Sequence, residues 1–283
     1  MLRPLEIVRQ ICHISDIHFG PPHLDDLSLG VLQFIGERQP DLVVLSGDLT
    51  QRAKPRQFHQ AREFVDDIPV PSLAVPGNHD VPLYRFWERF GGPFGAYRKH
   101  FGAELEPVHR DDELLVVGIN TAHGLTFKNG RFTPQRLQEV TALLADAPDG
   151  VSKVVVAHHP LVQPPWFGSQ PVATNAWEAM GVFSRLGVDL ILSGHLHQSF
   201  IGISETFYPR GCPPVILLHS GTTTSNRGRA GEHGRNTCNW IRIESDSLLI
   251  SNYRWDPVLH RFSEHSRHLY PRHSRHPYTL EDL

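Results

Sequence analysis

The chain has 283 residues, of which 40% are hydrophobic and 20% are charged, and its formal net charge is −3. This size and composition are typical of a globular protein with one large domain or two small ones. The negative balance argues against the basic field that binds nucleic acid polymers. No apolar stretch reaches 18 residues, so we expect no membrane span.

The three cysteines, Cys12, Cys212 and Cys238, are scattered and lack CxxC spacing. They predict buried or free thiols in a reducing compartment. Residues 1–10 lack a basic segment followed by an apolar run, so we expect no signal peptide. These features predict a soluble, cytoplasmic protein.

Short, β-branched apolar runs predict buried strands over residues 11–14, 42–45, 114–119, 154–157, 190–192 and 215–218. Between them, apolar residues at helical spacing predict helices over residues 24–38, 57–65, 83–101, 134–144 and 173–186. The fourth of these begins with Thr133 as N-cap and Pro134 in its first turn. Further strands are expected over residues 200–204, 240–243 and 248–253, so the pattern is that of an α/β protein with a β-rich second half.

The segment from His260 to Leu283 carries five histidines among arginines. We expect one domain over residues 1–259, followed by a tail over residues 260–283 that is solvated or packed against a partner. Adventitious metal binding by the tail is the alternative.

Five short motifs each follow a predicted strand and carry oxygen or imidazole donors. They are Asp16-Ile17-His18, Gly47-Asp48, Gly77-Asn78-His79-Asp80, His158-His159 and Gly194-His195-Leu196-His197. Each motif alone is common in turns and loops. Because α/β sheets bind ligands at the carboxyl ends of their strands, we expect the five motifs to meet. Together they predict a site for two metal ions that assists hydrolysis of a phosphate ester.

The spacing within the motifs suggests how the donors are presented. Asp16 and His18 would leave the same side of an extended segment, and His195 and His197 share that spacing. Gly47 would let the backbone turn tightly before Asp48. Carboxylate, imidazole and amide donors suit Mn, Fe or Zn without choosing among them.

In order and composition these motifs resemble the signature of the calcineurin-like metallophosphoesterase superfamily, which is D-x-H, GD, GNH-[DE], H and GHxH. The resemblance spans residues 13–197 and implies a four-layer αββα sandwich of two mixed β-sheets. It implies a first metal held by Asp16, His18 and His197, a second held by Asn78, His158 and His195, and a bridging Asp48. His158 is preferred to His159 because the family's ligand stands two residues before a proline, here Pro160.

Three branches of the superfamily match less well. Purple acid phosphatases carry Tyr at the position of Gln51, and protein Ser/Thr phosphatases carry GDxxDRG, which Gln51 and Ala53 interrupt. Lipid A pathway diesterases carry Arg at the position of His79. The motifs are most similar to those of the bacterial cyclic-nucleotide and glycerophosphodiester phosphodiesterases.

The resemblance implies hydrolysis of a cyclic nucleotide or another small phosphodiester by a metal-bound hydroxide. His79 is expected to stabilise developing charge or protonate the leaving group, and Asp80 to orient the His79 imidazole. A broad-range phosphomonoesterase and phosphodiesterase is the alternative, and an inactive scaffold is disfavoured because no donor is missing. Relatives are often dimers, which leaves a homodimer open.

Other residues are weaker candidates, because local hydrogen bonds explain them equally well: Arg52, Asn120, His123, His159 and His219. Trp166 and Phe167 are expected to cover the cleft rather than stack on a base. Substrate specificity is expected to lie in the loops over residues 160–174 and 221–234.

Overall fold

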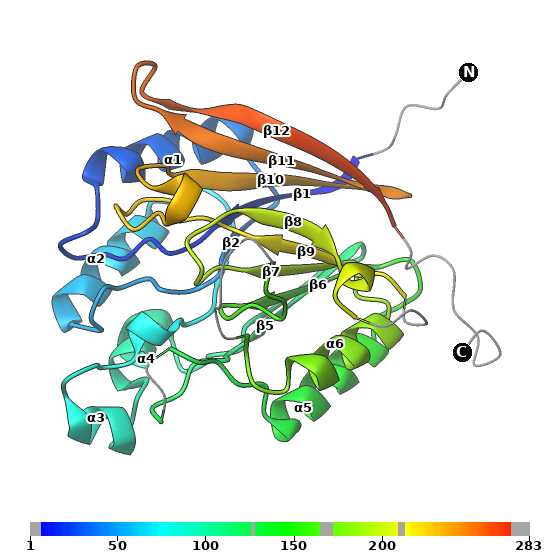
Figure 1. The fold of residues 1–283 in the computed structure, drawn as a ribbon, viewed down its shortest axis with the longest axis horizontal. Coiled ribbons are helices and arrows are strands. Elements are labelled where there is room, and N and C mark those ends of the chain that lie inside the picture. Colours follow the sequence, from blue (N-terminus) through cyan, green and yellow to red (C-terminus); the bar gives the residue numbers. More distant parts are fainter. Residues whose placement is uncertain (1–6, 126–127, 165–171, 209–212, 273–283) are drawn as a thin grey trace.

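Two six-stranded β-sheets form the centre of the molecule, with helices on their outer faces (Figure 1). This computed structural model describes residues 7–125, 128–164, 172–208 and 213–272. The strand orders are β12-β11-β10-β1-β2-β3 and β4-β5-β6-β7-β9-β8. The predicted α/β sandwich of two mixed sheets is confirmed.

The first sheet is parallel at one edge and antiparallel over the rest, whereas the second has a parallel centre with an antiparallel strand at each edge. The first sheet contains β1 (Ile7–Ile14), β2 (Leu42–Leu45), β3 (Ser72–Ala74), β10 (Thr237–Glu244), β11 (Ser247–Asp256) and β12 (Arg261–Pro271). The second contains β4 (Val108–Arg110), β5 (Leu114–Ile119), β6 (Ser152–Ala157), β7 (Leu190–Ser193), β8 (Phe200–Ile203) and β9 (Ile216–His219). The helices are α1 (Asp25–Arg38), α2 (Pro55–Asp66), α3 (Phe86–Gly91), α4 (Gly95–Phe101), α5 (Pro134–Ala145) and α6 (Ala176–Arg185).

Strand residues alternate between the core that separates the two sheets and the cores beneath the helices. In β1, Ile11 packs between the sheets, whereas Cys12 packs in the cluster that includes α1 and α2. In β7, Leu190 and Leu192 pack between the sheets, and Ile191 packs toward α5 and α6. Because both faces of these strands are buried, their sequences are continuous apolar runs rather than alternating ones.

The helix expected over residues 83–101 is wrong, because two shorter helices occupy this stretch. α3 ends at Gly91 and α4 begins at Gly95. Pro93 lacks the N–H that a helix interior needs, and it follows two glycines of low helical propensity. The predicted start of α5 is confirmed, since the Thr133 side chain accepts a hydrogen bond from the Arg136 N–H at 3.3 Å.

The tail predicted from residue 260 is wrong in its first half. Residues 261–271 form β12, which pairs antiparallel with β11 at the edge of the first sheet. Phe262 is buried, but most other side chains of β12 are partly or fully exposed. An edge strand is held largely by backbone hydrogen bonds on one side, so a polar sequence can form it. Residues 273–283 lie outside the described residues.

Within the described ranges, no helix is long and apolar enough to cross a membrane. Cys12 and Cys238 are buried free thiols on neighbouring strands, as expected. Cys212 lies outside the described residues.

Candidate metal centre

The carboxyl ends of β1, β2 and β3 in one sheet meet those of β6 and β7 in the other. The segments after these strands carry the five motifs. They bring together all seven residues predicted as metal ligands, in two adjoining groups of donor atoms. Residues as far apart in the chain as Asp16 and His197 therefore contribute to one site.

The first group consists of Asp16, His18, Asp48 and His197, whose donor atoms all lie within 4.8 Å of one another. His197 Nε2 is 2.9 Å from Asp16 Oδ1. His18 Nε2 is 3.5 Å from Asp16 Oδ1 and 3.6 Å from Asp48 Oδ2. All four side chains are buried, so two carboxylates and two imidazoles converge away from bulk water.

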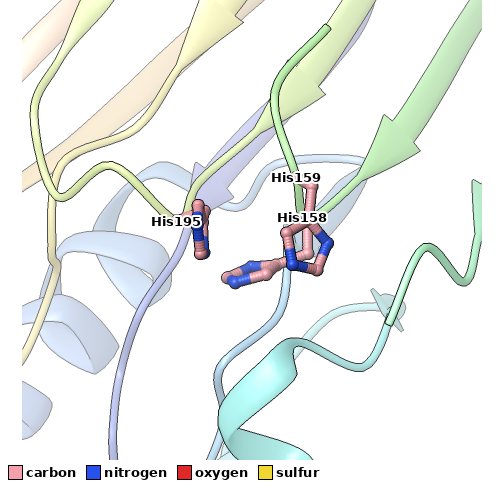
Figure 2. Close-up of side chains that lie close together, drawn as sticks. All are labelled: His158, His159 and His195. Carbon is pink, nitrogen blue, oxygen red and sulfur yellow. The ribbon is translucent and has the colours of Figure 1, made fainter. Parts of the chain in front are cut away.

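The second group adjoins the first through Asp48. His158 Nε2 is 3.3 Å from Asp48 Oδ1 and 3.2 Å from Asn78 Oδ1, and His195 Nδ1 is 2.9 Å from the same amide oxygen. Figure 2 shows His158 and His195 with His159, whose ring centroid lies 4.7 Å from that of His195. His159 also contacts the Thr121 hydroxyl through Nδ1, at 2.8 Å.

The expectation that Asp16 and His18 project from an extended segment is wrong. β1 ends at Ile14, and both residues have positive φ angles, 53° and 47°. Asp48, His195 and His197 share this left-handed conformation, which is uncommon for residues other than glycine. Such conformations cost about 1–3 kcal/mol each and persist where the surrounding fold holds them.

Gly47 is required where the loop after β2 approaches His158. Its φ is +99°, and a Cβ atom at this position would lie 2.6 Å from His158 Nδ1. Gly194 is required for a second close approach, because its Cβ would lie 2.4 Å from Asp16 Oδ2. Larger side chains at either position would push the two halves of the site apart.

The unpaired atoms of the site fit metal ions. Asp16 Oδ1 and Asp48 Oδ2 are buried and accept no hydrogen bond from the described residues. His158 Nδ1 lies 2.8 Å from the Ser46 carbonyl and His197 Nδ1 lies 2.9 Å from the Arg227 carbonyl. A carbonyl only accepts, so both Nδ1 atoms carry the proton and both Nε2 atoms can bind a cation.

Burial and charge act in opposite directions on these side chains. Burial lowers the pKa of His18 and of His195 to about 3, so both imidazoles are neutral, as metal ligands must be. Burial also opposes charge on His158 and Asp48, but their mutual attraction outweighs it. The pKa of His158 rises to about 9, and that of Asp48 falls well below its usual range, so a cation that binds His158 Nε2 would displace its proton.

The role expected for Asp80 is wrong. Its carboxylate does not contact the His79 imidazole, but accepts hydrogen bonds from the backbone N–H groups of Leu49, Thr50 and Gly77, at 3.1, 2.8 and 2.9 Å. Asp80 therefore fastens the loop after β2 to the loop after β3. It supports the site through the backbone.

His79 borders the donor groups and has other partners. Its backbone N–H donates to Asp48 Oδ1 at 2.8 Å, and its Nδ1 is 2.9 Å from the Gln51 carbonyl and 3.2 Å from Arg52 Nη1. The pKa of His79 lies below its usual value, because burial lowers it more than the Asp48 charge raises it. The side chain is thus held at the edge of the site by Gln51.

A cavity of about 290 Å³ opens over the donor groups. Its lining includes His79, the weaker candidate Arg52, and two residues that the sequence did not single out, Arg227 and Arg229. The loop over residues 221–234 was expected to carry specificity, but nothing in its sequence distinguishes these two arginines from others. Asn120 and His219 are buried, His123 is half-buried, and Trp166 and Phe167 lie outside the described residues.

Comparison with known proteins agrees with this geometry. Residues 9–199 match the family described as calcineurin-like phosphoesterase. The chain belongs to this family. Its members are phosphoesterases, so the predicted superfamily and the predicted enzyme class are confirmed.

Curated relatives of this calcineurin-like phosphoesterase are bacterial phosphodiesterases, as the motifs predicted. A probable cyclic nucleotide phosphodiesterase of Synechococcus is 28% identical over 193 residues, covering 64% of this chain and 67% of the relative. A cAMP/cGMP dual specificity phosphodiesterase of Mycobacterium tuberculosis is 27% identical over 263 residues, covering 85% and 78%. A glycerophosphodiester phosphodiesterase of Enterobacter lignolyticus is 36% identical over 80 residues, covering 25% and 29%.

Among solved structures, a dimetal phosphatase from Danio rerio superposes with a TM-score of 0.65 at 13% identity, covering 94% of this chain and all of the other. A purple acid phosphatase from yellow lupin gives 0.63 at 13% identity, covering 86% of this chain and 51% of the other. At this identity the likeness shows the fold alone.

Proposed function

We propose that the chain is a dinuclear metal-dependent phosphodiesterase that hydrolyses a cyclic nucleotide or another small phosphodiester. The observation that carries this proposal is the convergence of seven donors from two sheets beneath one cavity. The phosphodiesterase activity of the relatives named above supports the substrate class. The donor set suits Mn, Fe or Zn.

Asp16, His18 and His197 would hold one cation and Asn78, His158 and His195 the other, with Asp48 between them. When bound, such a pair supplies Lewis acidity and lowers the pKa of water, which makes hydroxide available at neutral pH. The side chains of the protein would orient the donors and transfer protons. The outer hydrogen bonds of His158 and His197 fix both rings, so the donors are ordered before substrate arrives.

His79 is the residue proposed to act on the leaving group. Its Nδ1–H donates to the Gln51 carbonyl, which leaves Nε2 as the atom that exchanges a proton. Burial lowers the pKa of His79, and the Asp48 charge offsets this lowering only in part, so the ring gives up a proton readily. Protonated on Nε2, the ring donates to the leaving oxygen or to a phosphoryl oxygen as charge develops.

A broad-range phosphomonoesterase and phosphodiesterase is the second candidate. The cationic lining of the cavity favours it, because Arg52, Arg227 and Arg229 would also accept the dianion of a phosphomonoester. An inactive scaffold is disfavoured by the complete donor set. The homodimer and the cytoplasmic location remain predictions.

A substrate panel with elemental analysis tests the proposal. The protein is loaded with Mn, Fe or Zn and assayed with cyclic AMP, bis-p-nitrophenyl phosphate and p-nitrophenyl phosphate. We expect about two metal ions per chain and higher kcat/KM for the diesters. A wide preference for the monoester would contradict the phosphodiesterase assignment, and a metal-free protein with full activity would contradict the site.

A further inference from the structure

Four basic side chains line the cavity above the metal centre: Arg52, Lys128, Arg227 and Arg229. In the described part of the chain, none of the four has a carboxylate within ion-pair distance. The carboxylate in the same lining is Asp48, which faces the two groups of metal donors. These side chains are therefore available to bind an anionic substrate.

Arg227 is positioned by contacts on both of its sides. Its Nη1 donates to Gln51 Oε1 at 2.8 Å, and its backbone carbonyl accepts from His197 Nδ1 at 2.9 Å. The preceding residue is also fixed, because the Asn226 N–H donates to the Pro22 carbonyl at 2.7 Å. The guanidinium is thus held at a set place relative to a metal ligand.

Gln51 joins Arg227 to the other side of the cavity. Its carbonyl accepts from Arg52 Nη1 at 2.9 Å, and the same Arg52 nitrogen lies 3.2 Å from His79 Nδ1. Burial and the neighbouring cations lower the pKa of Arg227, but Asp48 and Asp16 oppose this, and a guanidinium stays charged in proteins. Two ordered cations therefore stand beside His79.

The charges of the site exceed what a singly charged diester needs. Two divalent ions held by Asp16 and Asp48 would carry a surplus of about two positive charges. One phosphodiester anion and a hydroxide nucleophile would neutralise that surplus. The arginines are then left without a counter-charge in a partly buried cavity, which is unfavourable unless the substrate brings further anionic groups.

We propose that Arg227 and Arg52 form a second phosphate subsite, so that the preferred substrate is a diphosphate diester whose second phosphoryl group leaves. This inference rests on the proposed function. Guanidinium groups bind phosphate through paired, charge-assisted hydrogen bonds. The cavity of about 290 Å³ is at the lower end of small-molecule pockets, so groups beyond the diphosphate would extend toward solvent, where the exposed Arg229 and Lys128 line the cavity.

The reaction is hydrolysis of the phosphoanhydride bond. The oxygen of water forms a bond to the first phosphorus, and the bond from that phosphorus to the bridging oxygen breaks. The bridging oxygen leaves with the electron pair as part of the second phosphate, where Arg227 and Arg52 stabilise its charge. The products are two phosphomonoesters, and the protons of water go to these products or to solvent.

The test compares bis-p-nitrophenyl phosphate with P1,P2-bis-p-nitrophenyl diphosphate, which differ by one phosphoryl group. Wild type, Arg227→Gln and the control Arg185→Gln, an exposed arginine at the end of α6, are assayed with the same metal. We expect Arg227→Gln to lower kcat/KM about thirtyfold for the diphosphate, from one lost charge-assisted bond, and about threefold or less for the monophosphate diester. Arg185→Gln should match wild type.

Comparing wild type with variant on each substrate cancels the intrinsic reactivity of the two esters. Equal losses on both substrates, or no loss on either, would overturn the second phosphate subsite while leaving the diesterase intact. Failure of the metal-loaded wild type to hydrolyse either compound, or cyclic AMP, would instead overturn the proposed function.

Discussion

The two donor groups of the centre differ in charge and in exposure. The first, with Asp16, His18, Asp48 and His197, is buried and contains two carboxylates. The second shares Asp48 but adds a neutral amide and two imidazoles, and its Asn78 and His195 are only partly buried beside the cavity. The same fold thus builds a closed, strongly anionic group next to an open, weakly anionic one.

This difference predicts a division of labour. More carboxylates and less water favour tight retention of a cation in the first group. The second group has less negative charge and borders the cavity, so a cation there would exchange more readily and meet substrate oxygens directly. The comparison predicts an ordered loss of metal: a chelator should remove the second cation well before the first.

Asp48 is shared by both groups, so its replacement should have the largest effect. We expect Asp48→Asn to lower kcat/KM about a thousandfold, the equivalent of several kcal/mol of transition-state stabilisation from the metal pair. Metal content per chain should fall as well. The control is Asp149→Asn, an exposed aspartate far along the chain, which should retain wild-type activity. An active Asp48→Asn protein with full metal content would remove Asp48 from between the cations.

Asn78 and His18 belong to different groups, and their variants should separate the two cations. Asn78→Ala should keep about one metal ion per chain while kcat/KM falls several hundredfold, since one of two cations is lost. His18→Ala should weaken the tighter site. Elemental analysis after dialysis against a chelator series measures both. If both variants lost metal at the same chelator concentrations, the two groups would not differ in their affinity for a cation.

His79 tests whether the edge of the site acts apart from the metals. We expect His79→Asn to lower kcat about a hundredfold, the lower end for lost general-acid help, with metal content unchanged because His79 is outside both groups. His59→Asn, an exposed histidine on α2, is the matched control. If His79→Asn turned over substrate at the wild-type rate, His79 would have no part in the reaction.

Much of this centre follows from the sequence because each donor lies within a few residues of a buried strand. The position of Asp48 or His158 can be predicted from the end of an apolar run, and for Asp48 also from the neighbouring Gly47, which allows the chain to turn. The left-handed backbone of Asp16 is different, since it depends on contacts with the loops after β2 and β7. Such contacts between distant parts of the chain cannot be predicted from the local sequence.

The same reason explains what could not be predicted. Arg227 joins the site through Gln51, which lies 176 positions away in the chain. β12 is an edge strand whose pairing with β11 does not require an apolar pattern. The carboxylate of Asp80 meets backbone groups of another loop rather than its neighbour His79. Each of these features is decided by tertiary packing.

A buried chain of hydrogen bonds supports the first group from behind. Asn239 donates to His13 Nδ1 at 3.4 Å, so His13 Nε2 donates to the Ser46 hydroxyl at 2.8 Å. Ser46 donates to Ser15 at 2.8 Å, and Ser15 donates to Asp16 Oδ2 at 2.7 Å. Burial lowers the pKa of His13 to about 3, so the neutral ring keeps this direction. Because this series of hydrogen bonds ends on Asp16 Oδ2, it leaves Asp16 Oδ1 available to bind a cation.

Removing one hydrogen bond of this series should have the smallest effect on metal binding, and that effect should be confined to the first group. Ser15→Ala leaves the Ser46 hydroxyl without its acceptor, while Asp16 Oδ2 keeps the His195 N–H at 3.0 Å. We expect affinity for the tighter cation to fall about tenfold, as for other outer hydrogen bonds of metal ligands, with the weaker site unchanged. Ser152→Ala is the control, because that buried hydroxyl has no partner among the described residues. Equal affinities in the two variants would mean that the orientation of Asp16 is set by its backbone and by His195 alone.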